Sequence, residues 1–118
     1  MSINKNYYVI AGFDLTKYKT DKFEDWKWED ENEKYFCYQS KGHIQLFYDP
    51  MSDIHLYLGY ILGAGDEYEF SVIKTDIVEI EKLYWEVKKM LDYFNHVGVI
   101  DVEHQNVDYE VIAFEECT

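Results

Sequence analysis

The sequence of 118 residues contains no arginine, although it has 11 lysines and 24 acidic residues. Arginine holds carboxylates and phosphates through paired hydrogen bonds and is the commonest anchor for guanine edges. The formal net charge of −13 adds a field that repels phosphate backbones and anionic lipid surfaces. We therefore expect no direct binding to nucleic acid and none to a membrane. Codon bias in an AT-rich genome is an alternative cause of the missing arginine, but it leaves this physical consequence unchanged.

Cysteine and long apolar runs are also scarce. The two cysteines, Cys37 and Cys117, form neither a C-x-x-C pair nor a disulfide framework, so we expect both to be reduced thiols. The N-terminus lacks the apolar core of a secretory signal. The longest apolar stretch, around residues 56–65, is shorter than the roughly 20 residues that a membrane span requires. These absences predict a cytoplasmic protein.

Apolar and aromatic residues are plentiful. Hydrophobic residues make up 47% of the chain and aromatic residues 19%, which argues against disorder even at this net charge. A chain of this length is sufficient for one hydrophobic core. We expect a single folded domain over residues 1–118.

Short apolar runs separated by turn residues predict an antiparallel meander. The expected strands are residues 7–15, 35–39, 43–48, 54–62, 67–74 and 107–114, with a shorter candidate at residues 99–102. The strands at 7–15 and 54–62 have apolar groups on both faces, which predicts that they lie inside the sheet. Residues 16–33 are the most polar segment, and we expect a long loop there with at most a short helical turn.

Residues 76–96 carry apolar side chains at intervals of three and four, the pattern of an amphipathic helix. Asp76 and Glu79 occupy capping-box positions at its start, and Gly98 supplies a stop. Trp85 falls opposite the apolar stripe and is expected on the outer face. The sequence thus predicts an α+β fold, a mainly antiparallel sheet of about five to six strands packed against one long helix.

No motif for nucleophilic catalysis surrounds any of the four histidines. Asp49, Asp53 and His55 are the nearest approach to a constellation, and a half-buried structural histidine is the simpler interpretation of His55. The acidic run does not match an EF-hand loop, because counting from Asp30 places Tyr35 where a glycine is required. We therefore expect a non-enzymatic protein with no catalytic residue, no metal and no cofactor.

Acidic and aromatic residues interleave between residues 23 and 33. Tryptophan dominates binding hot spots, and neighbouring acids steer encounters toward a basic partner. The candidate partner-binding residues in this run are Glu24, Asp25, Trp26, Trp28, Glu29, Asp30, Glu31 and Glu33, and Trp85 is a second, independent candidate. The alternative is that one or both tryptophans of the run fold back onto the sheet while the acids solvate a loop.

The chain has the sequence GFDLT at residues 12–16, GHIQLFYDPM at 42–51 and HLYLGYI at 55–61. In these strand and turn sequences it resembles small uncharacterised acidic accessory proteins encoded by bacteriophages of Gram-positive bacteria. The resemblance covers about the first half of the chain and brings no activity or binding residues with it. It implies an early accessory phage protein acting in the host cytoplasm. That class often binds and disables a host defence or housekeeping protein.

Composition and resemblance together favour a non-enzymatic binding protein that inhibits a basic host protein. If that partner binds nucleic acid, the carboxylates act as a nucleic-acid mimic by standing where the partner expects phosphates. A toxin-immunity protein is the alternative within the binding class, since it uses the same complementarity against a basic toxin. A small-molecule-binding protein or enzyme with a pocket between helix and sheet is the alternative from another class. A homo-oligomer that associates through the Trp85 face is the last.

Overall fold

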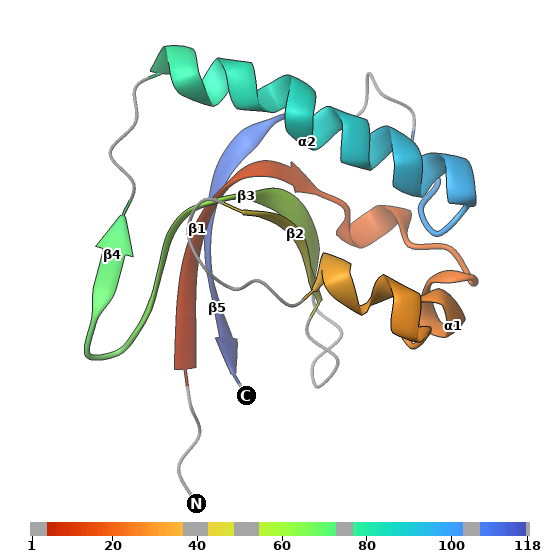
Figure 1. The fold of residues 1–118 in the computed structure, drawn as a ribbon, viewed down its shortest axis with the longest axis horizontal. Helices are drawn as coiled ribbons and strands as arrows, with labels where there is room; N and C mark the ends of the chain where they lie inside the picture. The colour runs from red at the N-terminus through yellow and green to blue at the C-terminus, as the bar shows by residue number, and fades with distance from the viewer. Residues whose placement is uncertain (1–4, 37–42, 49–54, 73–76, 103–106, 118) are drawn as a thin grey trace, which may run out of the picture.

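The computed structural model describes residues 5–36, 43–48, 55–72, 77–102 and 107–117. The elements, with η for a 3-10 helix, are β1 (Lys5–Asp14), η1 (Thr16–Tyr18), α1 (Phe23–Lys27), η2 (Asp30–Tyr35), β2 (Ile44–Tyr48), β3 (Leu56–Asp66), β4 (Phe70–Val72), α2 (Ile77–Val97) and β5 (Glu110–Cys117). Five antiparallel strands form one sheet, and α2 packs against it (Figure 1). The predicted α+β class is confirmed.

The sheet has the order β2-β3-β1-β5, so β1 and β3 lie inside it, as their two apolar faces predict. A bulge interrupts the β1–β3 pairing, because Val9 pairs with Gly63 while Ile10 pairs with Ile61. Leu62 is therefore an extra residue in β3. On the other edge of β3, β2 pairs with the half before this residue and β4 with the half after it. The bulge thus divides β3 between two partner strands.

Each face of the sheet carries its own apolar cluster. The larger cluster lies between the sheet and α2, and its buried members are Phe13, Leu15, Phe23, Leu46, Leu56, Leu58, Val87, Leu91, Phe94, Val99, Ile100 and Val102. The smaller cluster has Tyr8, Ile10, Phe47 and Ile61 as its buried members. The alternation predicted for β1 and β3 accounts for this division, since Phe13 and Leu58 belong to one cluster and Tyr8 and Ile61 to the other.

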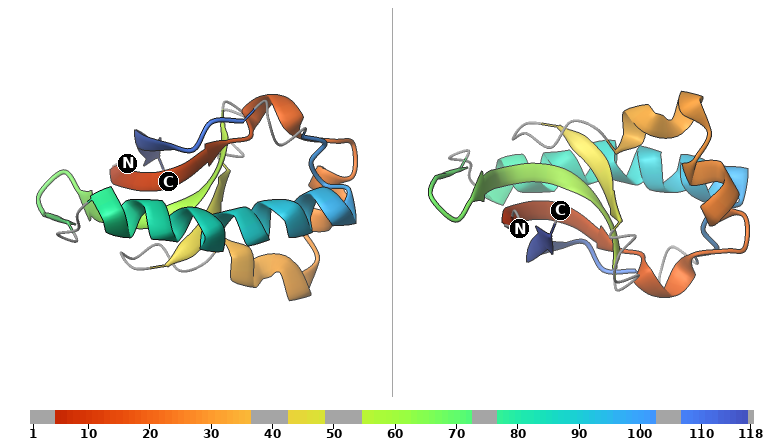
Figure 2. Two further views of the ribbon diagram at one scale, coloured as in Figure 1. Left: turned by 90° about the horizontal axis from the view of Figure 1, so that it is seen from above. Right: turned by 90° about the horizontal axis from the view of Figure 1, so that it is seen from below.

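The long helix begins and ends within one residue of the predicted range, and Asp76 lies outside the described residues. Its buried side chains, Val87, Leu91 and Phe94, lie at the midpoint of the helix or beyond it. The first turns lie toward the end of the molecule where β4 projects, while the last turns lie beside α1 and η2 (Figures 1 and 2). The C-terminal half of α2 therefore contributes most of its packing.

The prediction of a long loop with at most one short helical turn over residues 16–33 underestimated the helical content of this segment. This segment contains η1, α1 and the start of η2. Backbone bonds tie it to the chain after α2, because Thr20 N donates to Val99 O at 3.1 Å and Asp101 N donates to Tyr18 O at 2.9 Å. The high acid content concealed turns that are too short to show a helical period.

Several predicted strands also differ from the structure. β3 continues to Asp66, past the predicted end at residue 62, and β4 begins at Phe70 instead of residue 67. Within residues 35–39, Tyr35 ends η2 and Phe36 caps it, while the remainder lies outside the described residues. The segment 99–102 forms an isolated bridge between Lys19 and Ile100 instead of a strand. The last strand is β5, Glu110–Cys117, later than the predicted 107–114, because Tyr109 turns toward α2 and donates its hydroxyl to Ile80 O at 2.7 Å.

We predict that Gly98→Ala lowers the free energy of unfolding by about 1–2 kcal/mol, the cost of a left-handed backbone for a residue with a Cβ. Gly98 has a φ of 86°, and the space around a Cβ there holds only ordinary contacts with Lys22. The loss would therefore come from the backbone alone. Gly98→Asn should lose less, since asparagine tolerates this region better. Urea unfolding of the three proteins tests this, and equal stability would contradict the proposed helix stop.

Ionisation of the Tyr109 hydroxyl should make the free energy of unfolding depend on pH in the alkaline range. Burial raises the pKa of Tyr109 to about 12 from its usual value of 10.0. Because the folded state has the higher pKa, the neutral phenol stabilises the fold fully below pH 10, and this contribution is lost as pH rises through 12. We expect Tyr109→Phe to lose less stability over that pH window than the wild-type chain. Urea unfolding at several alkaline pH values measures the difference, with Tyr68→Phe at an exposed tyrosine as the control.

Candidate functional site

The acidic segment is held in shape by a buried asparagine. Asn32 donates from Nδ2 to the carbonyl oxygen of Trp26 at 2.9 Å and to Glu29 Oε2 at 3.3 Å. Its backbone N–H donates to the carbonyl oxygen of Glu29 at 3.0 Å. A buried amide with satisfied hydrogen bonds fixes the turn between α1 and η2. Asn32 was missed at the sequence level, where its only signal is a single neutral polar residue within a run of charges.

Trp26 turns inward. Its ring stacks on Tyr35 with centroids 5.7 Å apart and meets the edge of Phe94 on α2 at 5.4 Å. It also contacts Phe23 and Phe36. For this tryptophan, the alternative of folding back onto the core describes what the structure has. Packing, and not exposure, is its main role.

Trp28 turns outward. It caps the C-terminal end of α1, and 73% of its surface is exposed. It lines a groove of about 320 Å³ together with Lys27, Glu29, Asp30, Glu33, Phe36 and Tyr48. Four of the predicted partner-binding residues, Trp28, Glu29, Asp30 and Glu33, are thus brought together. We call this feature the acidic groove.

The other predicted acids of the run are exposed but do not line the acidic groove. Asp25 lies on α1 and Glu31 on η2. The carboxylate of Glu24 is held by a hydrogen bond, because the hydroxyl of Tyr48 donates to Glu24 Oε1 at 2.8 Å. Glu24 Oε2 also lies 3.0 Å from the ammonium of Lys27.

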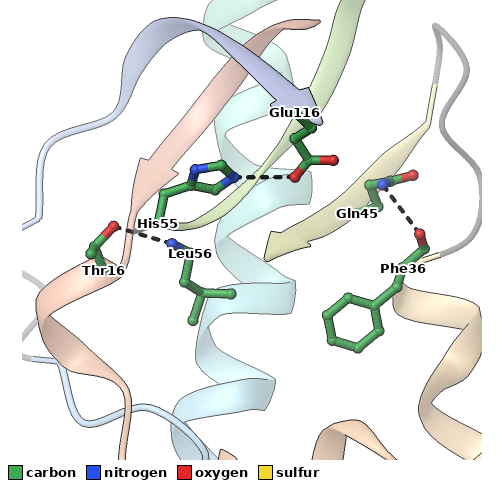
Figure 3. Close-up of polar contacts among 6 residues, drawn as sticks. All are labelled: Thr16, Phe36, Gln45, His55, Leu56 and Glu116. Atoms are coloured by element: carbon green, nitrogen blue, oxygen red, sulfur yellow. Dashed lines mark hydrogen bonds and ion pairs between the residues drawn. The ribbon is translucent and has the colours of Figure 1, made fainter. Parts of the chain in front are cut away.

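Three residues of the acidic groove were missed at the sequence level: Lys27, Phe36 and Tyr48. Phe36 directly follows η2, whereas Tyr48 ends β2 and reaches the groove through long-range folding. Gln45 links these two segments, since its Nε2 donates to the carbonyl oxygen of Phe36 at 3.4 Å (Figure 3). No local pattern in the sequence pairs them with the acidic run.

Trp85 lies on α2 away from these residues and does not line the acidic groove. Its surface is 62% exposed, which confirms the predicted outer face. The ring contacts Tyr84 edge-on at 5.0 Å, and the ammonium of Lys88 lies 5.6 Å from its centroid. Trp85 is therefore a separate exposed aromatic side chain.

His55 is buried as a structural residue. Its Nε2 lies 3.1 Å from Glu116 Oε1 (Figure 3). Its ring stacks on that of Tyr57 with centroids 4.6 Å apart. Phe114 meets both of these rings edge-on, with its centroid 5.3 Å from that of His55 and 4.8 Å from that of Tyr57. Asp49 and Asp53, the expected companions of His55, lie outside the described residues. The histidine and carboxylate are thus packed among aromatic rings.

A second groove, of about 410 Å³, lies where β1 leads into η1. It is lined by Asp14, Thr16, Lys17, Tyr18, Tyr57, Val107, Asp108 and Glu110. Burial, with added repulsion from Asp14 and Glu110, raises the pKa of Tyr57. Neither this groove nor the acidic groove is lined by a histidine or by a residue of α2. Neither is therefore the helix–sheet pocket that the small-molecule alternative requires.

Across the described ranges, no three histidine, cysteine, aspartate or glutamate side chains are arranged to hold a metal ion. The helices of the same ranges include none that is long and apolar enough to cross a membrane. Comparison with protein-family models, curated proteins and solved structures gives no match to this chain.

We predict that the two tryptophans of the acidic run differ sharply when replaced. Trp26→Ala should lower the free energy of unfolding by about 3 kcal/mol, the lower end for a large aromatic core residue, because its ring is only partly buried. Trp28→Ala should change it by no more than about 0.5 kcal/mol, as expected for an exposed position. Urea unfolding measures both, and similar losses in the two variants would contradict the inward and outward assignments.

Proposed function

We propose that the chain is a non-enzymatic binding protein that captures a basic partner protein through the acidic groove. The observation that carries the proposal is the exposed ring of Trp28 beside Glu29, Asp30 and Glu33 in one concave surface. The proposed biological role is that of a phage accessory protein which inhibits a host protein in the host cytoplasm. The partner-facing aromatic contact is Trp28, since Trp26 is engaged in packing.

Exposure of Trp28 supports a binding role, because burial of a large aromatic ring against a partner is strongly favourable. The ring also stands on a framework that is already ordered. Asn32 fixes the turn after α1, and the stacked rings of Trp26 and Tyr35 fix α1 itself. A preordered surface binds more tightly because less side-chain and backbone freedom is lost on association.

The charge supports a basic partner. Carboxylates of Glu29, Asp30 and Glu33 line the acidic groove, and the whole chain has a net charge of −13. Such a field accelerates encounters with a positively charged protein and slows them with an acidic one. We therefore propose that the partner presents lysine or arginine side chains at the contact surface.

A host protein that binds nucleic acid is the partner we favour. Its phosphate-binding lysines and arginines would accept closely spaced carboxylates, and occupation of that surface would block the nucleic acid. A toxin-immunity protein would use the same complementarity. Competition by nucleic acid would show that the partner's contact surface binds phosphates, and the identity of the captured protein, host factor or toxin, separates the two proposals.

Affinity capture from a lysate of a Gram-positive bacterium tests the proposal. The wild-type chain should capture a basic protein at about 50 mM salt and release most of it at about 200 mM. Trp28→Ala, and the combined Glu29→Gln, Asp30→Asn and Glu33→Gln variant, should each reduce capture at least tenfold. Trp85→Ala is the matched control, since it removes an exposed tryptophan from another element.

Duplex DNA added to the captured complex tests whether the partner's contact surface binds nucleic acid, and identification of the captured protein tells a host protein from a toxin. Release by DNA, together with loss of the partner's nucleic-acid binding in the presence of the chain, supports the mimic. Capture that survives both acidic-groove variants contradicts the proposal. Loss of capture in Trp85→Ala alone would move the contact to α2. Self-association through the Trp85 face stays a prediction.

A further inference from the structure

The ammonium group of Lys27 is enclosed within the protein's own aromatic side chains. Its Nζ lies 4.1 Å from the ring centroid of Tyr48, 4.9 Å from that of Trp28 and 5.9 Å from that of Phe23. Glu24 Oε2 lies 3.0 Å away on another side. Only 10% of the Lys27 side chain is exposed, although lysine is normally among the most exposed residues.

This environment is chemically complementary to an alkylammonium group. Aromatic faces attract cations through their quadrupoles, and sets of rings with a carboxylate bind methylated or unmodified ammonium groups in proteins. The carboxylate of Glu24 is itself held, since the hydroxyl of Tyr48 donates to Glu24 Oε1 at 2.8 Å. We call the three rings and Glu24 the cation cage.

The cation cage opens into the acidic groove. Trp28 and Tyr48 belong to both, and Lys27, which occupies the cage, also lines the groove together with Glu29, Asp30 and Glu33. A positively charged side chain that entered the groove would first meet these carboxylates and then reach the face of Trp28. The acids attract a cation, and the rings and Glu24 are placed to hold it.

We propose that the cation cage is the site at which the chain binds an alkylammonium group, the side chain of a lysine on the partner, and that Lys27 is its internal occupant. The partner's lysine displaces Lys27 and takes its place among the rings. That this ligand is a lysine of the partner rests on the proposed function. The affinity of the cage for ammonium groups rests only on the arrangement of the rings and Glu24.

An internal occupant makes the site selective. Lys27 is tethered beside the cage and competes at an effective concentration on the order of millimolar. A free ammonium ion gains too little from the cage alone to replace it. A protein partner that also contacts Trp28 and the acids gains more, so displacement is coupled to the formation of the whole interface.

Removal of Lys27 should therefore open the cage to small cations. We compare the full chain with Lys27→Ala and with Lys17→Ala, which removes the same charge from an exposed position. Each protein is titrated with tetramethylammonium chloride while the amide signals of Glu24 and Tyr48 are followed by NMR, and sodium chloride at equal ionic strength is the blank. Lys27→Ala should bind tetramethylammonium at least tenfold more tightly than the wild-type chain and Lys17→Ala.

Adding Trp28→Ala to Lys27→Ala should return the affinity to that of the wild-type chain, because one wall of the cage is lost. If Lys27→Ala titrates like Lys17→Ala, the proposal is overturned. A tenfold gain that persists without Trp28 would also overturn it, since the cation would then bind elsewhere.

A second measurement uses the wild-type chain and does not depend on how well Lys27→Ala folds. We expect the rings that surround Lys27 to shift its side-chain proton signals away from those of a free lysine. Saturation with trilysine should move these signals toward the free-lysine positions as Lys27 leaves the cage. Signals that stay shifted while trilysine binds would show that the cage keeps its internal occupant, and the proposal would fail.

The two proposals fail separately. If the cage binds tetramethylammonium in Lys27→Ala but the chain captures no basic protein, the cage stands and the proposed function falls. If a basic protein is captured and the cage shows no gain on removal of Lys27, the proposed function stands without this site.

Discussion

The contact between Trp26 of α1 and Phe94 of α2 holds the acidic segment, α1 and η2, against the long helix. A helix of five residues does not form by itself in water, because too few backbone bonds offset the loss of chain entropy. The carboxylates of the segment oppose its ordering further by repelling one another. Burial of Trp26 and Phe23 at the end of the main cluster supplies the opposing free energy. The charged surface is therefore maintained by the apolar packing beneath it.

The elements that could be predicted are those with a long repeated pattern. The helix shows its period over 21 residues, and β1 and β3 show apolar groups on both faces. The helical turns of residues 16–35 escaped prediction because none spans enough residues to establish a period. The start of β5 was misplaced because the alternating pattern continues through Tyr109, whose hydroxyl is bound by α2 instead. Local pattern and tertiary contact disagree there, and the tertiary contact determines the structure.

The acidic groove was predictable in composition but not in shape. Trp26 and Trp28 are equivalent in a loop, whereas two positions along a helical turn point to nearly opposite sides. Once α1 forms, one ring must face Phe94 and the other must face water. Tyr48 joins the groove from a different part of the chain, which no pattern within residues 23–33 indicates. Lys27 was counted only as charge, because enclosure by rings is a property of the fold.

The extra residue in β3 divides the edge of β3 that faces away from β1 into two short stretches. β2 pairs with Leu56 to Tyr60, and β4 pairs only with Gly63 to Gly65. Without this interruption, one long, flat edge strand could pair with all 11 residues of β3. The outer backbone groups of such an edge strand would be unpaired and could recruit another chain. The step at Leu62 limits the neighbours to five and three residues and adds local twist. On this side, a sheet rich in aromatic side chains is thereby made a poor template for fibrils.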